Sequence, residues 1–144
     1  MHTILIDKLR SYLVENDPDL LISLQGDYSV TRYLEDKVYQ VMPLAEQLIA
    51  EDKPQYIIEE LCLDELTKEL RPSKFHYIKE ILEEDFLQAY SRFREAGVLT
   101  YEVINLIEAC QHTFDSIGFT EENENDRALK YAIMADIQEY LERG

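Results

Sequence analysis

Apolar side chains recur at every third or fourth position through most of this 144-residue chain, the spacing of one buried face of an α-helix. Capping residues, prolines or glycines separate seven such segments. No stretch of four or more residues alternates strictly enough to favour a strand. We therefore predict an all-α fold, at least about 65% helical, as a compact bundle of about six to seven helices. No linker is long enough to divide the chain, so we expect a single domain over residues 1–144.

The first helix boundaries come from prolines and from residues that cap helix ends. The first helix is predicted to end at Asn16, where Asp17 can cap a short second helix that starts at Pro18. Gly26 and Asp27 are predicted to end this second helix.

A long third helix follows, and a proline lies inside it. Ser29 is its predicted N-cap. Pro43 should kink or break this helix near Met42, because proline removes one hydrogen bond and crowds the preceding turn. The apolar stripe of this segment consists of Val30, Leu34, Val38, Val41, Ala45 and Leu48.

The fourth helix is predicted to begin at Pro54 and to end near Leu70, before the sharp boundary Arg71-Pro72-Ser73. Its apolar residues do not keep to one stripe, and a helix that is apolar on several sides is normally buried on several sides. We therefore expect it at the centre of the fold, in contact with the third and fifth helices and one other element. Leu61→Asp should then unfold the domain. If the rest of the chain cannot cover this helix, a second copy must, which predicts a two-fold homodimer.

Three further helices are predicted in the rest of the chain. Their expected positions are Ser73 to Gly97, Thr100 to Gly118, and a last segment after the polar loop 121–125.

The charge is the most informative feature of the composition. Asp and Glu outnumber Lys and Arg by 30 to 14, which gives a formal net charge of −16. Binding to DNA, RNA or anionic lipid requires a basic patch, so direct contact with these ligands is not expected. A protein partner, quite plausibly a basic one, fits this surface better.

The two cysteines predict a reducing compartment. Cys62 and Cys110 lie far apart in apolar runs and form no C-x-x-C pair. Two buried thiols are therefore expected, with one long-range disulfide in a secreted protein as the alternative. The N-terminus lacks the basic and apolar regions of a signal peptide, and no apolar run approaches the roughly 20 residues that span a bilayer. We expect a cytoplasmic protein that does not enter a membrane.

No pattern of metal ligands is complete. The pairs His76/Glu80 and Glu108/His112 are each four residues apart, whereas di-iron bundles use Glu-x-x-His and zinc proteases use H-E-x-x-H. The run 121–126 fails as a calcium loop, because a glycine at its sixth position and a glutamate at its twelfth are both missing. We predict no metal site and no cofactor.

No catalytic constellation is evident either. Glu80, Glu83, Glu84 and Asp85 are expected to form a solvated helix face, not a pair of catalytic carboxylates. Burial would make both thiols inert, and the three histidines, His2, His76 and His112, have no local nucleophile. We predict no catalytic residue and no enzymatic activity. The ten tyrosines suit half-buried core edges, or alternatively a partner-binding surface.

Part of the chain resembles a family of small helical bacterial proteins of unknown function, often found near mobile elements. The resemblance covers about residues 9–90 and is carried by YLVENDPDL at 12–20, QYIIEELCLDEL at 55–66, LRPSKF at 70–75 and ILEEDF at 81–86. It implies a bacterial, all-helical protein and supplies no catalytic residue. Together with the charge, it favours an acidic helical protein-interaction or structural module. The alternative is an acidic nucleic-acid mimic that occupies a DNA-binding protein.

Overall fold

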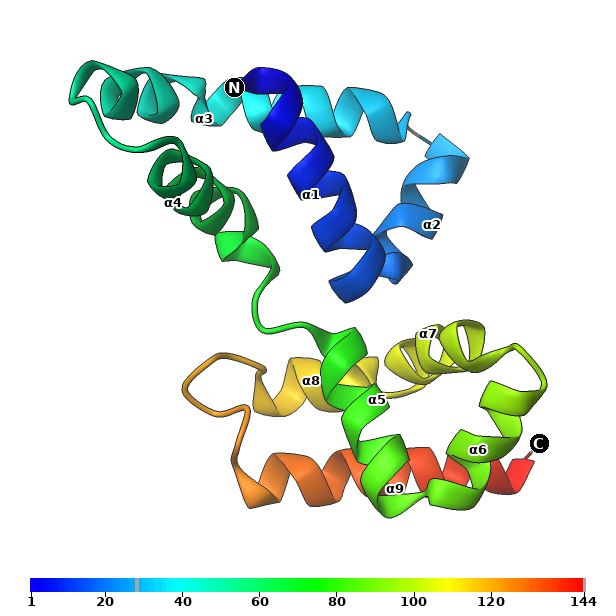
Figure 1. The fold of residues 1–144 in the computed structure, drawn as a ribbon. Coiled ribbons are helices and arrows are strands. Elements are labelled where there is room, and N and C mark those ends of the chain that lie inside the picture. The colour runs from blue at the N-terminus through cyan, green and yellow to red at the C-terminus, as the bar shows by residue number, and fades with distance from the viewer. Residues whose placement is uncertain (28, 144) are drawn as a thin grey trace. The chain divides into compact units, whose positions relative to one another are not determined.

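The computed structural model describes residues 1–27 and 29–143, and these form helices joined by short connections, without a strand (Figure 1). Helix accounts for 83% of the structure, which confirms the predicted fold class. The elements in chain order are α1 His2–Asn16, α2 Pro18–Asp27, α3 Val30–Ala50, α4 Gln55–Thr67, the 3₁₀ turn η1 Lys68–Leu70, α5 Lys74–Asp85, α6 Leu87–Glu95, α7 Leu99–Ala109, α8 Gln111–Ile117 and α9 Arg127–Arg143.

The chain divides into two compact units, which we call the N-terminal unit, Met1–Arg71, and the C-terminal unit, Pro72–Gly144. Each unit has its own cluster of buried apolar side chains. We expected one domain over residues 1–144, and this division was not anticipated. Helical periodicity shows which face of a helix is buried, but it does not show which other helix covers that face.

In the N-terminal unit, α1, α3 and α4 pack against one another, and α2 packs against α1 and α3. Ser29 caps α3 as predicted, with its hydroxyl accepting a hydrogen bond from the amide of Arg32. Each helix of the trio contributes a single stripe to the core. The buried residues are Leu5, Leu9 and Leu13 from α1, then Leu34, Val38, Val41, Ala45 and Leu48 from α3, and Ile58, Cys62 and Leu66 from α4.

The predicted break near Met42 is absent, because α3 continues through Pro43 as one helix. Proline removes one backbone hydrogen bond and costs about 3 kcal/mol in a helix interior. Val41 and Ala45, on either side of the proline, are both buried in the same core. Their burial holds both halves of α3 in one helical register, and the free energy of this burial offsets the cost of the proline. The other predicted outcome, a kink of α3 near Pro43 without a break in the helix, stays a prediction.

The predicted central position of α4 is wrong. Ile58, Cys62 and Leu66 are buried along one stripe, whereas Leu61 is 44% exposed and Tyr56 is 69% exposed. The predicted contact with α3 is confirmed, and the other helix that α4 packs against within its unit is α1. The helix is apolar on several sides but buried on one, so its remaining apolar residues lie at its flanks or in solvent.

In the C-terminal unit, α7 is the element that contacts most of the others: it packs against α5, α6, α8 and α9. Two predicted helices are each divided in two here, so the described residues contain nine α-helices and not six or seven. The first division is at Phe86, whose backbone angles (φ −135°, ψ 50°) leave the helical region between α5 and α6. The second is at Cys110, between α7 and α8. Neither position carries a proline or glycine, so no local signal marks it.

Several predicted helix ends are confirmed. The hydroxyl of Ser73 accepts a hydrogen bond from the amide of His76 at the start of α5. Gly97 (φ +74°) follows α6, and the amide of Val98 donates to the carbonyl of Phe93, the bonding pattern of a Schellman motif. The predicted cap at Thr100 is wrong, because α7 begins at Leu99 with Val98 as its N-cap.

The exposure of Leu61 reverses the outcome expected for its mutation. Leu61→Asp should leave the protein folded and lower the free energy of unfolding by about 1–2 kcal/mol, because little apolar surface is lost and the carboxylate stays hydrated. Ile58→Asp, one turn away on the buried stripe, should cost more than about 4 kcal/mol. Urea denaturation of both variants measures the difference. Equal losses would show that the outer side of α4 is buried in solution.

A second prediction concerns Asp17, between α1 and α2. Its Oδ2 atom is buried without a hydrogen-bond partner, and burial together with the charge of Asp19 raises its pKa from 3.8 to about 6. Because the folded state favours the protonated form, this residue's contribution to stability falls as the pH rises from about 4 to about 6 and is then constant. Asp17→Asn should therefore stabilise the protein by about 1–2 kcal/mol at neutral pH, after a discount for its partial exposure, and by much less near pH 4.

The matched control is Glu60→Gln, which makes the same charge change at an exposed position of α4. Thermal melts of wild type and both variants across this pH range would test the effect. An equal gain from both variants would mean that general charge repulsion, and not the environment of Asp17, is responsible.

Candidate functional site

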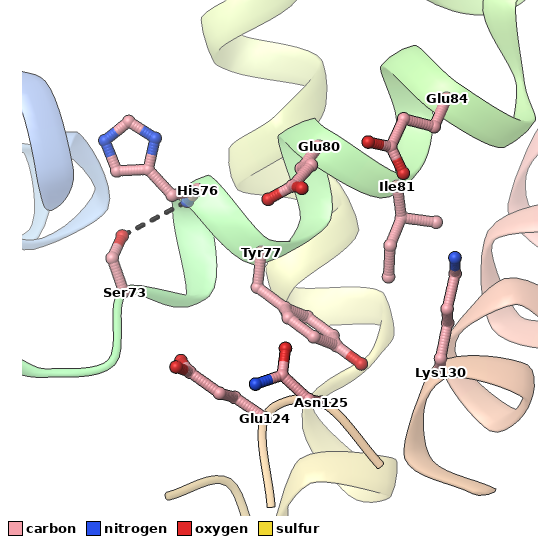
Figure 2. Close-up of a pocket in the computed structure, with 9 residues that line it drawn as sticks. All are labelled: Ser73, His76, Tyr77, Glu80, Ile81, Glu84, Glu124, Asn125 and Lys130. Atoms are coloured by element: carbon pink, nitrogen blue, oxygen red, sulfur yellow. Dashed lines mark hydrogen bonds between the residues drawn. The ribbon is translucent and has the colours of Figure 1, made fainter. Parts of the chain in front are cut away.

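The C-terminal unit contains a cavity of about 370 Å³ beside α5 (Figure 2). One wall is α5 with its capping residue, and the other comes from the loop between α8 and α9 and from the first turn of α9. The lining residues are Ser73, His76, Tyr77, Glu80, Ile81, Glu84, Glu124, Asn125 and Lys130.

The helical repeat of α5 explains its share of the lining. His76, Glu80 and Glu84 are spaced four residues apart and therefore share one side of the helix. Phe75, Ile78 and Leu82 lie on the opposite side and are buried in the core. The predicted pair His76/Glu80 thus lies on the cavity wall, beside residues that are distant in the sequence.

The loop between α8 and α9 is held by its own hydrogen bonds. The side-chain amide of Asn123 donates to the carbonyl of Gly118 at 2.8 Å, and its side-chain oxygen accepts from the amide of Thr120 at 2.7 Å. Gly118 has a φ of +90°, which suits glycine and ends α8 as predicted. Asp126 closes the loop by accepting from the amide of Ala128 at the start of α9. These bonds hold the backbone that carries Glu124 and Asn125.

Tyr77 is the least expected member of the lining. Figure 2 shows its ring extending from α5 toward the loop that carries Asn125. The ring packs against Phe114 and Phe119, with centroids 6.1 and 4.9 Å away, while the hydroxyl is buried and makes no hydrogen bond to a protein atom. Burial, with the charges of Asp126, Cys110 and Glu124 adding to it, raises the pKa of Tyr77 to about 12. The hydroxyl is therefore neutral at physiological pH and is a free donor and acceptor.

The charges around the cavity are mainly negative. Glu80, Glu84 and Glu124 contribute carboxylates, and Lys130 contributes an ammonium group. The ammonium of Lys130 lies 3.5 Å from the carboxylate of Asp85, so its charge is offset by a residue outside the lining. This arrangement favours a cationic ligand over an anionic one.

A second polar cluster joins α8 to α9. The hydroxyl of Thr113 donates to one oxygen of Asp136, and Nε2 of His112 lies 3.5 Å from the other. The sequence pairs His112 with Glu108, whereas in the structure its Nε2 lies beside Asp136, from a helix distant in the sequence. The hydroxyl of Thr113 also lies 3.3 Å from Nε2 of His112, so it contacts both the imidazole and the carboxylate. This cluster links α8 to α9.

The other sequence candidates are spread over the two units. Cys62 and Cys110 are both free and fully buried, one in each unit. The acidic run at the end of α5 is exposed, as predicted for a solvated face. No group of three or more His, Cys, Asp or Glu side chains in residues 1–27 and 29–143 is placed to hold a metal ion. Asp136, Lys130 and Asn125 were missed, because only the packing of distant elements makes them neighbours.

The N-terminal unit has two grooves along α4. One, of about 300 Å³, lies between α3 and α4 and includes Lys37, which pairs with Glu69 at 3.8 Å. The other, of about 390 Å³, lies between α1 and α4 and includes Leu63 and Tyr12. The first groove is lined by both acidic and basic side chains, and the second exposes more apolar surface than the first. Neither groove therefore favours a ligand of one charge as clearly as the cavity on α5.

Comparisons with known proteins give no further guidance. No family model, curated protein or solved structure matches the chain. The resemblance to a family of small bacterial helical proteins therefore stays a prediction. None of the helices in the described part of the chain combines the length and apolar character needed to cross a bilayer.

Both thiols are expected to react slowly in the native protein. Burial raises the pKa of Cys62, and burial together with the charge of Asp136 raises that of Cys110 to about 12, so at pH 8 roughly one Cys110 side chain in 10⁴ is a thiolate. Titration with a chromogenic disulfide should show two slow groups that become fast in urea, and Cys62→Ala and Cys110→Ala assign them. Two fast groups in native protein would contradict burial, and a mass two daltons low would reveal a disulfide.

Proposed function

We propose that the protein is a non-enzymatic, acidic helical interaction module that binds a basic segment of a partner protein in the bacterial cytoplasm. The observation that carries this proposal is a carboxylate excess that the chain cannot neutralise itself. Each of the two units holds 15 acids and 7 bases, so each has an excess of 8 negative charges. Even complete internal pairing would leave these carboxylates without a basic partner.

Local ion pairs support this interpretation. Lys8 lies 3.4 Å from Glu59, and Arg71 lies 2.9 Å from Asp64, so basic side chains of the chain are already engaged with its own acids. A partner rich in Lys or Arg would meet carboxylates for which the chain has few basic side chains of its own. Such complementarity accelerates association and excludes acidic competitors.

Exposed tyrosines also support a binding role. Tyr39, Tyr56, Tyr101 and Tyr131 are each 62–76% exposed, whereas Tyr90 is buried in the core. Tyrosine is enriched at protein interfaces because it combines a large apolar area with a polar tip. The exposed tyrosines are therefore available to a partner, whereas Tyr90 packs in the core.

The remaining parts of the proposal rest on less direct support. Two buried, free thiols agree with a reducing compartment. Exposure of Leu61 and Tyr56 on α4 leaves apolar surface that a second copy could cover, so the homodimer stays a prediction. The nucleic-acid mimic also stays a prediction. It requires rows of carboxylates along one face, and no contact among the described residues indicates such rows.

Salt-dependent capture tests the proposed function. The full-length chain, immobilised and exposed to a lysate of its own organism at low salt, should retain a protein with a Lys- or Arg-rich segment. Raising the ionic strength from about 0.1 M to 1 M shortens the screening length from about 10 to 3 Å and should release that protein. An unrelated acidic helical protein of equal net charge is the control. Retention of the same proteins by the control, or no loss at high salt, would contradict the proposal.

A further inference from the structure

The groove between α1 and α4 in the N-terminal unit has an apolar floor that is open to solvent. Its volume is about 390 Å³, and its lining includes Tyr12 and Leu63, which are both half-buried. Tyr56 lies seven residues before Leu63 and therefore shares its side of α4, and it is 69% exposed. An aromatic and aliphatic surface thus extends over both helices.

The shape of the groove suits a helix. Because α1, α3 and α4 pack against one another, α3 lies on one side of the α1–α4 pair and covers the buried stripes of both helices. The groove opens on the other side of this pair, so a helix laid in it repeats the packing that α3 makes. From Asp7 to Glu15 the lining extends for roughly 12 Å along α1, at about 1.5 Å per residue. This length accommodates apolar anchors at positions i, i+4 and i+7 of a bound helix.

The two rims of the groove determine the charge of its occupant. Glu15 on α1 and Glu60 on α4 are exposed, and in residues 1–27 and 29–143 neither pairs with a basic side chain. The two helices together carry six acids and two bases. Both bases, Lys8 and Arg10, already lie 3.4 and 3.9 Å from acids of this unit. Carboxylates are therefore in excess on both sides of the apolar floor.

We propose that this groove binds an amphipathic helix of the partner protein, with apolar residues on one face and Lys or Arg on both sides of that face. The inference rests on the proposed function, because it names the surface and the kind of segment through which the basic partner binds. The apolar anchors pack on Tyr12 and Leu63, and the flanking basic residues reach Glu15 and Glu60. A second copy of the chain fits less well, because it brings another unit with an excess of 8 acids against these rims.

A designed peptide tests the groove. A fluorescent peptide of about 18 residues, with leucines at helical spacing and arginines on both flanks, should bind the full-length chain saturably and become helical on binding. The same composition with the leucines moved off the stripe should bind at least about tenfold more weakly, and a version with glutamates in place of arginines should not bind. Amide shifts of the ¹⁵N-labelled chain should be concentrated in α1 and α4. Equal affinity for the scrambled peptide, or shifts spread over both units, would overturn the proposal.

Two leucine variants on opposite sides of α4 test the apolar floor. Leu63→Ala should weaken peptide binding about fivefold, because it removes apolar contact area from the groove. Leu61→Ala removes the same group two residues away and should change binding less than about twofold. Thermal melts check that both variants are folded, and equal losses of binding would contradict the groove. In light scattering without peptide, a doubled mass that Leu63→Ala alone abolishes would place a second copy in the groove and would also overturn the proposal.

Charge variants test the rims. Glu15→Gln/Glu60→Gln should weaken peptide binding about tenfold. The matched control Glu46→Gln/Glu51→Gln removes the same charge from exposed positions outside the lining and should change binding less than about twofold. Equal losses in both double variants would show that the peptide responds only to net charge, and the groove would then be wrong.

The outcomes also distinguish this inference from the proposed function. If the peptide does not bind in the groove but a basic protein is still captured and released by salt, the groove is wrong and the interaction module stands. If the peptide binds with the predicted variant pattern but no basic protein is captured, the groove recognises a basic helix and the proposed function fails.

Discussion

The structure depends on the burial of one apolar stripe from each principal helix in two separate cores. A chain segment of roughly 70 residues buries only about 60% of the surface it exposes when unfolded, so its stability margin is small. In the N-terminal unit the stripe of α3 is the longest, and it holds that helix together across Pro43. In the C-terminal unit α7 has the same role, because the stripes of its neighbours close around Val103, Leu106 and Ile107.

Charge works against this burial. Each unit carries the same excess of acids, and at neutral pH their repulsion opposes compaction in both. Some charge also lies at unfavourable positions, such as Asp17, whose carboxyl group is partly buried next to Asp19.

The cavity on α5 lies where apolar burial and surface charge meet on one helix. The same helix that buries Phe75, Ile78 and Leu82 presents His76, Glu80 and Glu84 on its other side. The aromatic packing that stabilises the core of this unit also fixes the ring of Tyr77, whose hydroxyl is buried without a hydrogen-bond partner in the protein.

The sequence by itself determined the helical class, most helix ends and the buried stripes outside α4, because these depend on side chains a few residues apart. Ser29, Ser73, Gly97 and Gly118 act locally, and each has the predicted effect. Only the tertiary structure decided the divisions at Phe86 and Cys110, the continuity of α3 and the single buried face of α4. It also decided the candidate site, since Tyr77 and Lys130 are brought together by packing of helices more than fifty residues apart along the chain. Local patterns specify which faces of the helices are apolar. Which of these faces pack together depends on contacts between residues distant in the sequence, and helices with similar patterns do not reveal their partners.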